Sequence, residues 1–164
     1  MFFASDNGSG AAPEIITAIT RANDGYARSY GADPIMARVK TLVRDLFEAP
    51  EAEVYLVATG TAANSLSIAL LTPPWAAIFA HAEAHVAVDE CGAPEFFTAG
   101  AKMIGVAGEH GKMTPQSLSD ALSRVGEGGV HGVQRGMLTL TNVTEAGAVY
   151  TPTEIAALTA LAKA

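Results

Sequence analysis

A short polar turn, Thr59-Gly60-Thr61, follows an apolar run and precedes a helical stretch. In this layout exposed backbone N–H groups and two hydroxyls point at one spot, where the dipole of the following helix also favours an anion. The turn is therefore a candidate phosphate-binding cup. The same tripeptide also serves as an ordinary strand-to-helix turn with a capping threonine, and it lacks the lysine of the longer phosphate loop.

Two of the four histidines lie near the ends of apolar runs that are predicted to be strands. His85 follows the run at 75–79, and His131 precedes the run at 137–140. An imidazole changes its charge near neutral pH, so either residue is a candidate acid–base group. The alternative is a structural hydrogen-bonding role, which is the commoner fate of a lone histidine.

Other reactive side chains give weaker signals. His81 and His85 are four residues apart but have no Cys or Asp cluster at ligand spacing, so we expect no metal site. The adjacent acids Asp89 and Glu90 form either an acid–base group or a solvated face. Cys91 has no evident activating neighbour, and as the one cysteine it allows no internal disulfide, which fits a reducing cytoplasm.

The elements that must position these residues alternate between helix and strand. An unbroken apolar run at 54–58 predicts a strand covered on both faces. Further strands are expected at 75–79, 103–106 and 137–140, and helices at 13–22, 34–47, 62–71, 94–99, 115–125 and from Pro152 onward. This alternation indicates an α/β fold with a mostly parallel sheet.

Composition limits the class of protein. With 164 residues, 49% of them apolar and 16% charged, the chain can bury one substantial core, and no domain boundary is evident. A formal charge of −7 repels phosphate backbones, so nucleic-acid binding is not expected. The apolar stretch at 66–80 is broken by Pro73 and Pro74 and is too short to span a membrane. The last predicted helix has no stop signal before Ala164, which suggests a cut or a frayed terminus.

Five blocks of the sequence, taken together and in order, resemble the threonine aldolases, a family of β-eliminating lyases. The blocks are Phe3-Ala4-Ser5-Asp6-Asn7, Tyr30-Gly31-Ala32-Asp33-Pro34, Thr59-Gly60-Thr61-Ala62-Ala63-Asn64, residues 84–93, and Thr144-Glu145-Ala146-Gly147 with Val149-Tyr150. Their order and spacing make chance similarity far less probable than for any one block. The bacterial low-specificity and phenylserine-aldolase-like branch is the most similar.

This resemblance implies an enzyme of fold type I that depends on pyridoxal 5′-phosphate. Such enzymes split β-hydroxy-α-amino acids into glycine and an aldehyde, with the cofactor as electron sink. The implied architecture is a three-layer αβα sandwich, of which residues 1–164 would supply an amino-terminal arm and part of the cofactor-binding large domain. The implied assembly is a homo-oligomer, a dimer or tetramer, with shared active sites.

The resemblance also assigns roles around the cofactor. Thr59, Gly60 and Thr61 would hold its phosphate, and His85 would stack its imidazole on the pyridine ring and act in catalysis. Glu90 matches a family carboxylate near the cofactor.

Three further residues would act on the substrate. His131 would help to move the proton of the β-hydroxyl, Ser5 would meet the substrate carboxylate, and Tyr30 would lie near the neighbouring subunit's site. The lysine that forms a Schiff base with the cofactor has no counterpart among Lys40, Lys102, Lys112 and Lys163. The 164 residues alone are therefore expected to be inactive.

Two alternatives to the aldolase remain. The same fold hosts aminotransferases and decarboxylases, although the blocks around His85 and Thr144 argue against them. The other alternative is a non-catalytic module that binds anions or dimerises.

Overall fold

The computed structural model describes residues 8–126 and 129–163. The chain forms two compact units, Met1–Tyr55 and Leu56–Ala164. The sequence analysis predicted no boundary here, because Tyr55 and Leu56 both belong to the apolar run expected as a strand.

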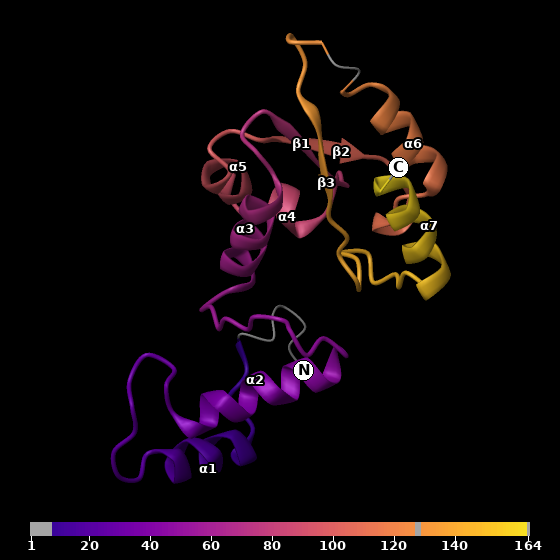
Figure 1. The fold of residues 1–164 in the computed structure, drawn as a ribbon. Helices are drawn as coiled ribbons and strands as arrows, with labels where there is room; N and C mark the ends of the chain where they lie inside the picture. The colour runs from indigo at the N-terminus through magenta and orange to yellow at the C-terminus, as the bar shows by residue number, and fades with distance from the viewer. Residues whose placement is uncertain (1–7, 127–128, 164) are drawn as a thin grey trace. The chain divides into compact units, whose positions relative to one another are not determined.

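The first unit contains two helices, α1 (Pro13–Ala22) and α2 (Pro34–Leu46), as the sequence predicted (Figure 1). Each begins with proline, which has no backbone N–H and so leaves no donor unpaired in the first turn of the helix. The Asp33 side chain caps α2 by accepting a hydrogen bond from the backbone N–H of Met36 at 2.8 Å. No residue of either helix is buried, so their apolar faces are left open.

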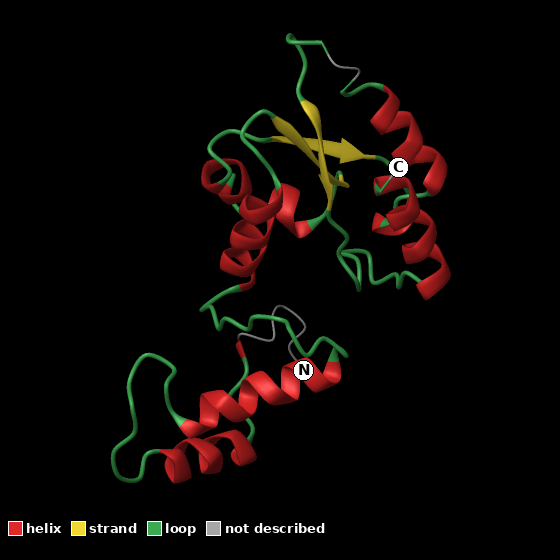
Figure 2. Ribbon diagram, in the orientation of Figure 1, coloured by secondary structure: helices red, strands yellow, loops and turns green. Residues whose placement is uncertain are grey.

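The second unit is built on a parallel sheet with the strand order β2-β1-β3 (Figure 2). The strands are β1 (Ala76–His81), β2 (Lys102–Val106) and β3 (Gln134–Leu138). The central strand β1 pairs in parallel with both neighbours, and all six of its residues are buried. Burial on both faces is why its sequence shows no polar alternation.

Helices cover both faces of this sheet, which gives the predicted three-layer αβα arrangement (Figure 2). Ala77 and Phe79 of β1 belong to one core cluster, together with residues of α6 (Pro115–Ser123) and α7 (Pro152–Ala162). Ile78 and Ala80 belong to the other, with residues of α3 (Gly60–Leu71) and α4 (His85–Val88). The alternation follows from the two-residue period of a strand. The shorter helix α5 (Ala93–Phe97) packs against α3.

A bulge in β3 shifts its pairing with β1. Ala77 pairs with Arg135 and Ile78 with Met137, so Gly136 is the extra residue between them. A Cβ atom at Gly136 would lie 2.5 Å from the carbonyl oxygen of Ala77, closer than real contacts allow. Glycine is therefore required where the two backbones approach.

The strand predicted at 54–58 is wrong: the structure gives this segment no regular secondary structure. Tyr55 and Leu56 are 80% and 70% exposed. A buried strand needs neighbours on both edges and faces, and among the described residues no strand pairs with this segment. The three other strands and the helices lie where they were expected, within a few residues at their ends. Two short elements were not predicted, the helix α4 (His85–Val88) and a 3₁₀ helix, η2 (Glu109–Gly111).

None of the helices in the described ranges combines the length and the apolar character needed to cross a membrane.

Candidate active site

A pocket of about 420 Å³ lies in the second unit, next to the carboxyl ends of β1 and β3. Open α/β sheets bind their ligands at this edge. The lining comes from the first turns of α3, the start of α4 and the segments that follow α4 and β3. The lining residues are Gly60, Asn64, His85, Val86, Glu90, Thr139, Leu140, Thr141 and Glu145.

The amino end of α3 reaches this pocket through Gly60, whereas Thr59 and Thr61 are not among its lining residues. The Thr59 hydroxyl caps the helix by accepting from the backbone N–H of Ala62 at 3.1 Å. In the described part of the chain, the backbone N–H groups of Gly60 and Thr61 have no hydrogen-bond partner. A Cβ atom at Gly60 would meet nothing within 4 Å, so the space beside this backbone is open. Free donors at a helix start, beside open space, suit an anion.

His85 is the first residue of α4 and presents its half-exposed imidazole to the pocket. Its Nδ1 atom lies 2.9 Å from Oε1 of Glu90, whose side chain is fully buried. This hydrogen bond is the main reason that the pKa of His85 lies above its ordinary value of 6.5. Burial opposes the rise, and the charges of Glu145 and Asp89 add to it. His85 therefore keeps its positive charge to a higher pH than a free imidazole.

The same carboxylate oxygen is also bound from α3. The side-chain amide of Asn64 donates to Oε1 of Glu90 at 2.6 Å, so α3 and α4 meet through one buried acid. Sequence reasoning assigned Asn64 no role. A helical spacing signal was available, because Asn64 follows Gly60 by four residues and so faces the same side of α3.

The structure does not bring His131 to this pocket. His131 lies exposed in the loop before β3, at the amino end of that strand. The pocket is lined instead by Thr139 and Thr141, which follow the carboxyl end of the same strand. The length of the strand therefore separates His131 from this pocket, and its expected role in moving the proton of the β-hydroxyl stays a prediction.

The remaining predicted residues belong to the first unit. Tyr30 is fully exposed and has a positive φ of 60°. Ser5 lies outside the described residues. Neither residue is placed relative to the pocket.

His81, which the sequence did not single out for chemistry, has a structural role. Its ring is buried, and its Nε2 atom lies 3.0 Å from the carbonyl oxygen of Gly108. Its Nδ1 accepts a hydrogen bond from the backbone N–H of Glu83 at 3.1 Å. With Nδ1 accepting, Nε2 is the nitrogen that donates.

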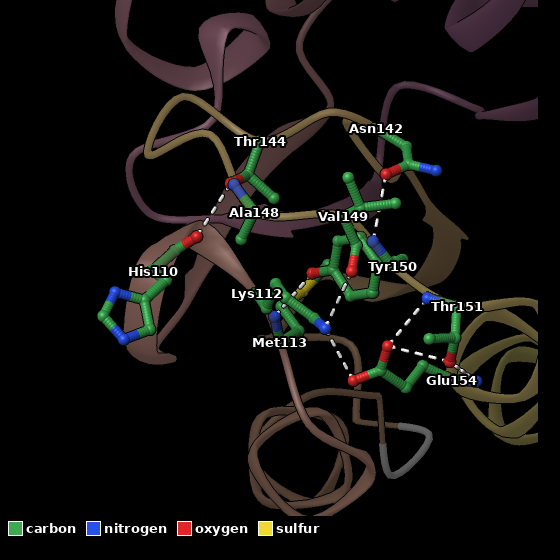
Figure 3. A network of polar contacts seen from close by, with 10 residues as sticks. All are labelled: His110, Lys112, Met113, Asn142, Thr144, Ala148, Val149, Tyr150, Thr151 and Glu154. Atoms are coloured by element: carbon green, nitrogen blue, oxygen red, sulfur yellow. Dashed lines mark hydrogen bonds and ion pairs between the residues drawn. The ribbon is translucent and has the colours of Figure 1, made fainter.

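Glu145 was also missed as a lining residue, and it lies on a segment that is fixed to the rest of the unit (Figure 3). The hydroxyl of the preceding residue, Thr144, donates to the carbonyl oxygen of His110 at 2.8 Å. The same hydroxyl accepts from the backbone N–H of Ala148 at 3.1 Å. These bonds hold the turn that carries Glu145.

The far end of this segment is anchored at Tyr150 (Figure 3). The backbone N–H of Tyr150 donates to Oδ1 of Asn142 at 3.0 Å, and its buried hydroxyl accepts from the backbone N–H of Met113 at 2.6 Å. Lys112 lies over the Tyr150 ring and forms an ion pair with Glu154 of α7 at 2.6 Å. The segment after β3 is thus tied to the connection between β2 and α6.

Known proteins are similar to this chain over nearly its whole length. Residues 3–164 match the family model described as beta-eliminating lyase. Over 162 residues the chain is 44% identical to the low specificity L-threonine aldolase of Pseudomonas aeruginosa strain PAO1 and 43% identical to that of Pseudomonas sp. strain NCIMB 10558. Each alignment covers 98% of this chain and 46% of the relative, so the chain spans about half the length of these relatives.

A solved structure is similar as well. The threonine aldolase of Leishmania major superposes with a TM-score of 0.87 at 29% sequence identity, over 95% of this chain and 44% of the other.

Proposed function

This chain belongs to the beta-eliminating lyase family, and from that premise we propose that it supplies part of an aldolase active site that depends on pyridoxal 5′-phosphate. The reaction is the cleavage of a β-hydroxy-α-amino acid, of the threonine or phenylserine type, to glycine and an aldehyde. The observation that carries the proposal is one pocket that combines free N–H donors at the start of α3 with the His85–Glu90 pair. The threonine aldolases that match at 44% and 43% identity support the choice of reaction.

The donor set of the pocket fits a phosphorylated pyridine cofactor. The free backbone N–H groups of Gly60 and Thr61 would bind the phosphate, with the hydroxyls of Thr59 and Thr61 beside them. The imidazole of His85 would lie against the ring, and Glu90 would hold that imidazole in place. When bound, pyridoxal phosphate supplies an electron-withdrawing ring that takes up the electron pair of the bond being broken.

Three titratable residues line the pocket, and proton movement falls to His85 and Glu145 because Glu90 is engaged by His85 and Asn64. Nδ1 of His85 is engaged with Glu90, while Nε2 has no hydrogen-bond partner among the described residues. Nε2 is therefore the atom that would hold or release a proton near the substrate hydroxyl. The carboxylate of Glu145 faces the same space and is the second candidate. His131 has no part in this proposal, because it lies at the other end of β3.

We further propose that none of these 164 residues is the lysine that binds the cofactor covalently. No lysine is among the described residues that line the pocket. Lys102 stands at the start of β2, the end of the sheet away from the pocket, and Lys112 is engaged by Glu154. Residues 1–164 would then comprise an arm and part of the cofactor-binding domain, with Ser5 and Tyr30 meeting substrate in the assembled enzyme.

The proposal is tested by separating cofactor binding from turnover. The purified chain is titrated with pyridoxal phosphate, followed by absorbance and by competition with inorganic phosphate. It is then incubated with phenylserine while benzaldehyde is measured. We expect weak binding that phosphate competes away, and no release of benzaldehyde. Absence of any binding would contradict the assigned pocket, and turnover at an enzymatic rate would show that the lysine assignment is wrong.

Two further proposals concern the setting of the enzyme. The assembly is a homo-oligomer with shared sites, which the open apolar faces of α1 and α2 support. The compartment is the reducing cytoplasm, which the single, unpaired Cys91 supports.

A further inference from the structure

We infer that Asn64 is a positioning residue of this site, which fixes the Glu90 carboxylate and through it the orientation and protonation of His85. The inference deepens the proposed function, because it explains what holds the imidazole toward the pocket. It concerns only residues that the structure places in contact, so it can be tested without cofactor or substrate.

The geometry that carries the inference is the sharing of one oxygen atom. Oε1 of Glu90 accepts from the amide of Asn64 at 2.6 Å and lies 2.9 Å from Nδ1 of His85. Asn64 is on α3, His85 opens α4, and Glu90 follows α4. Short hydrogen bonds to an ionised carboxylate are the stronger kind. The position of Oε1 is thus set from two helices at once.

The burial of Glu90 makes these two donors essential. Its side chain is fully buried, and its second oxygen, Oε2, has no hydrogen-bond partner among the described residues. A carboxylate charge out of water is costly unless donors satisfy it. With Oε2 unsatisfied, the loss of Asn64 would leave His85 as the one described donor to this charge.

Asn64 can do this work because its amide does not titrate. It holds Oε1 in the same place whether or not His85 carries a proton, so Nδ1 of His85 stays directed at Glu90 and Nε2 stays directed away from it. The charged groups that face His85 are Glu90 and Asp89 beside α4 and Glu145 from the segment after β3. From α3, Asn64 contacts this carboxylate with a neutral, polar amide and adds no charge.

The test is an NMR titration of the His85 imidazole in the purified chain without ligand, with its signals identified by their loss in His85→Gln. In Asn64→Ala the buried carboxylate loses one of its two donors and depends on the imidazolium of His85, so we expect the pKa of His85 to rise further, by about half a unit or a roughly threefold tighter proton affinity. An unchanged or lower pKa would overturn the inference. Asn64→Ser, which keeps a small polar side chain, serves if the alanine variant does not fold.

Two controls make the result specific. Ser65→Ala alters the next residue of α3, whose buried hydroxyl has no hydrogen-bond partner in the described chain, and should leave the His85 pKa unchanged. Repeating Asn64→Ala in a Glu90→Gln background should leave the His85 pKa of that background unchanged, because Asn64 acts only through the Glu90 carboxylate. A rise in that background equal to the rise in the native chain would mean that Asn64 does not act through Glu90. Cofactor binding is measured separately, so its failure would count against the proposed function and leave this inference standing.

Discussion

At the scale of single residues, the fold of the described chain does not explain the glycine at position 60. Its backbone does not adopt the left-handed conformation that favours glycine, and a Cβ atom there would enter open space. Nothing within the described chain therefore requires glycine at the start of α3. The proposed phosphate contact would require it, because a group bound close to this backbone leaves no room for a Cβ atom.

Gly60→Ala should therefore separate stability from binding. We expect the free energy of unfolding to stay the same or to rise by about 0.4–1 kcal/mol, because alanine restricts the unfolded chain. Binding of pyridoxal phosphate should weaken, because the new methyl group occupies the space of the phosphate. Gly132→Ala is the matched control, since a Cβ atom there also meets open space but lies outside the pocket. Equal binding by the two variants would argue against the assigned cup.

At the scale of elements, the connection after β3 depends on a buried tyrosine. The hydroxyl of Tyr150 satisfies the backbone N–H of Met113, and both residues are buried. Burial is also the main reason that the pKa of Tyr150 is raised, although the bond from Met113 opposes it. The phenol thus remains a neutral hydroxyl at neutral pH.

Tyr150→Phe removes this acceptor and keeps the ring beneath Lys112. The Met113 N–H would then be buried without a partner, so we expect a loss of about 1–3 kcal/mol in the free energy of unfolding. Urea unfolding followed by circular dichroism measures it. Tyr26→Phe, at a fully exposed tyrosine, should change nothing. A similar small effect of both substitutions would show that the buried bond contributes little.

The ion pair between Lys112 and Glu154, at the start of α7, should make the stability of the fold depend on pH. The hydrogen bond from Lys112, followed by those from Thr151, lowers the pKa of Glu154 from its ordinary value of 4.5 to about 2. A lowered folded-state pKa contributes stability above pH 4.5 that is lost as the pH falls toward 2.

Glu154→Gln should therefore lower the urea midpoint at pH 7, and the difference from the native chain should shrink steadily below pH 4.5. The effect is modest, because the carboxylate is partly exposed to solvent. Glutamine still serves the capping box with Thr151, so the helix start is preserved. Glu51→Gln, an exposed acid outside the ion pairs of the described residues, is the control. A difference that does not depend on pH would contradict the ion-pair explanation.

At the scale of the whole molecule, large apolar side chains are exposed in both units. In the first unit they include Ile15 and Ile19 of α1 and Leu42 and Leu46 of α2, and in the second Leu70 and Trp75. Ile15 and Ile19 are four residues apart on α1, and Leu42 and Leu46 are four apart on α2, so each pair shares one helix face. Exposed apolar faces are typical of protein interfaces.

We therefore expect the purified chain to self-associate in a concentration-dependent manner, as measured by light scattering after size exclusion. Leu42→Glu should weaken this association, because it places a charge on the open face of α2. Lys40→Glu changes the charge of the same helix without altering an apolar position and is the matched control. A monodisperse monomer at high concentration would count against the oligomer.

The sequence by itself predicted three of the strands, the six longer helices and the family. Helix starts such as Asp33-Pro34 and Thr151-Pro152 are set by local capping chemistry, and the buried strand β1 is recognisable from its unbroken apolar run. The Thr59-Gly60-Thr61 turn and His85 were also recognisable from the residues around each of them. The structure brings Gly60 and His85 to one pocket.

What only the tertiary structure decided depends on distant pairing. Residues 54–58 look like a buried strand, yet they form none because no described strand lies beside them. His85 and His131 look equivalent, but the direction of β3 leaves only His85 at the pocket. Asn64 gained its role from an acid 26 positions away. Local sequence encodes caps and periodicity, whereas which side chains meet depends on strand order and direction, which only the folded chain fixes.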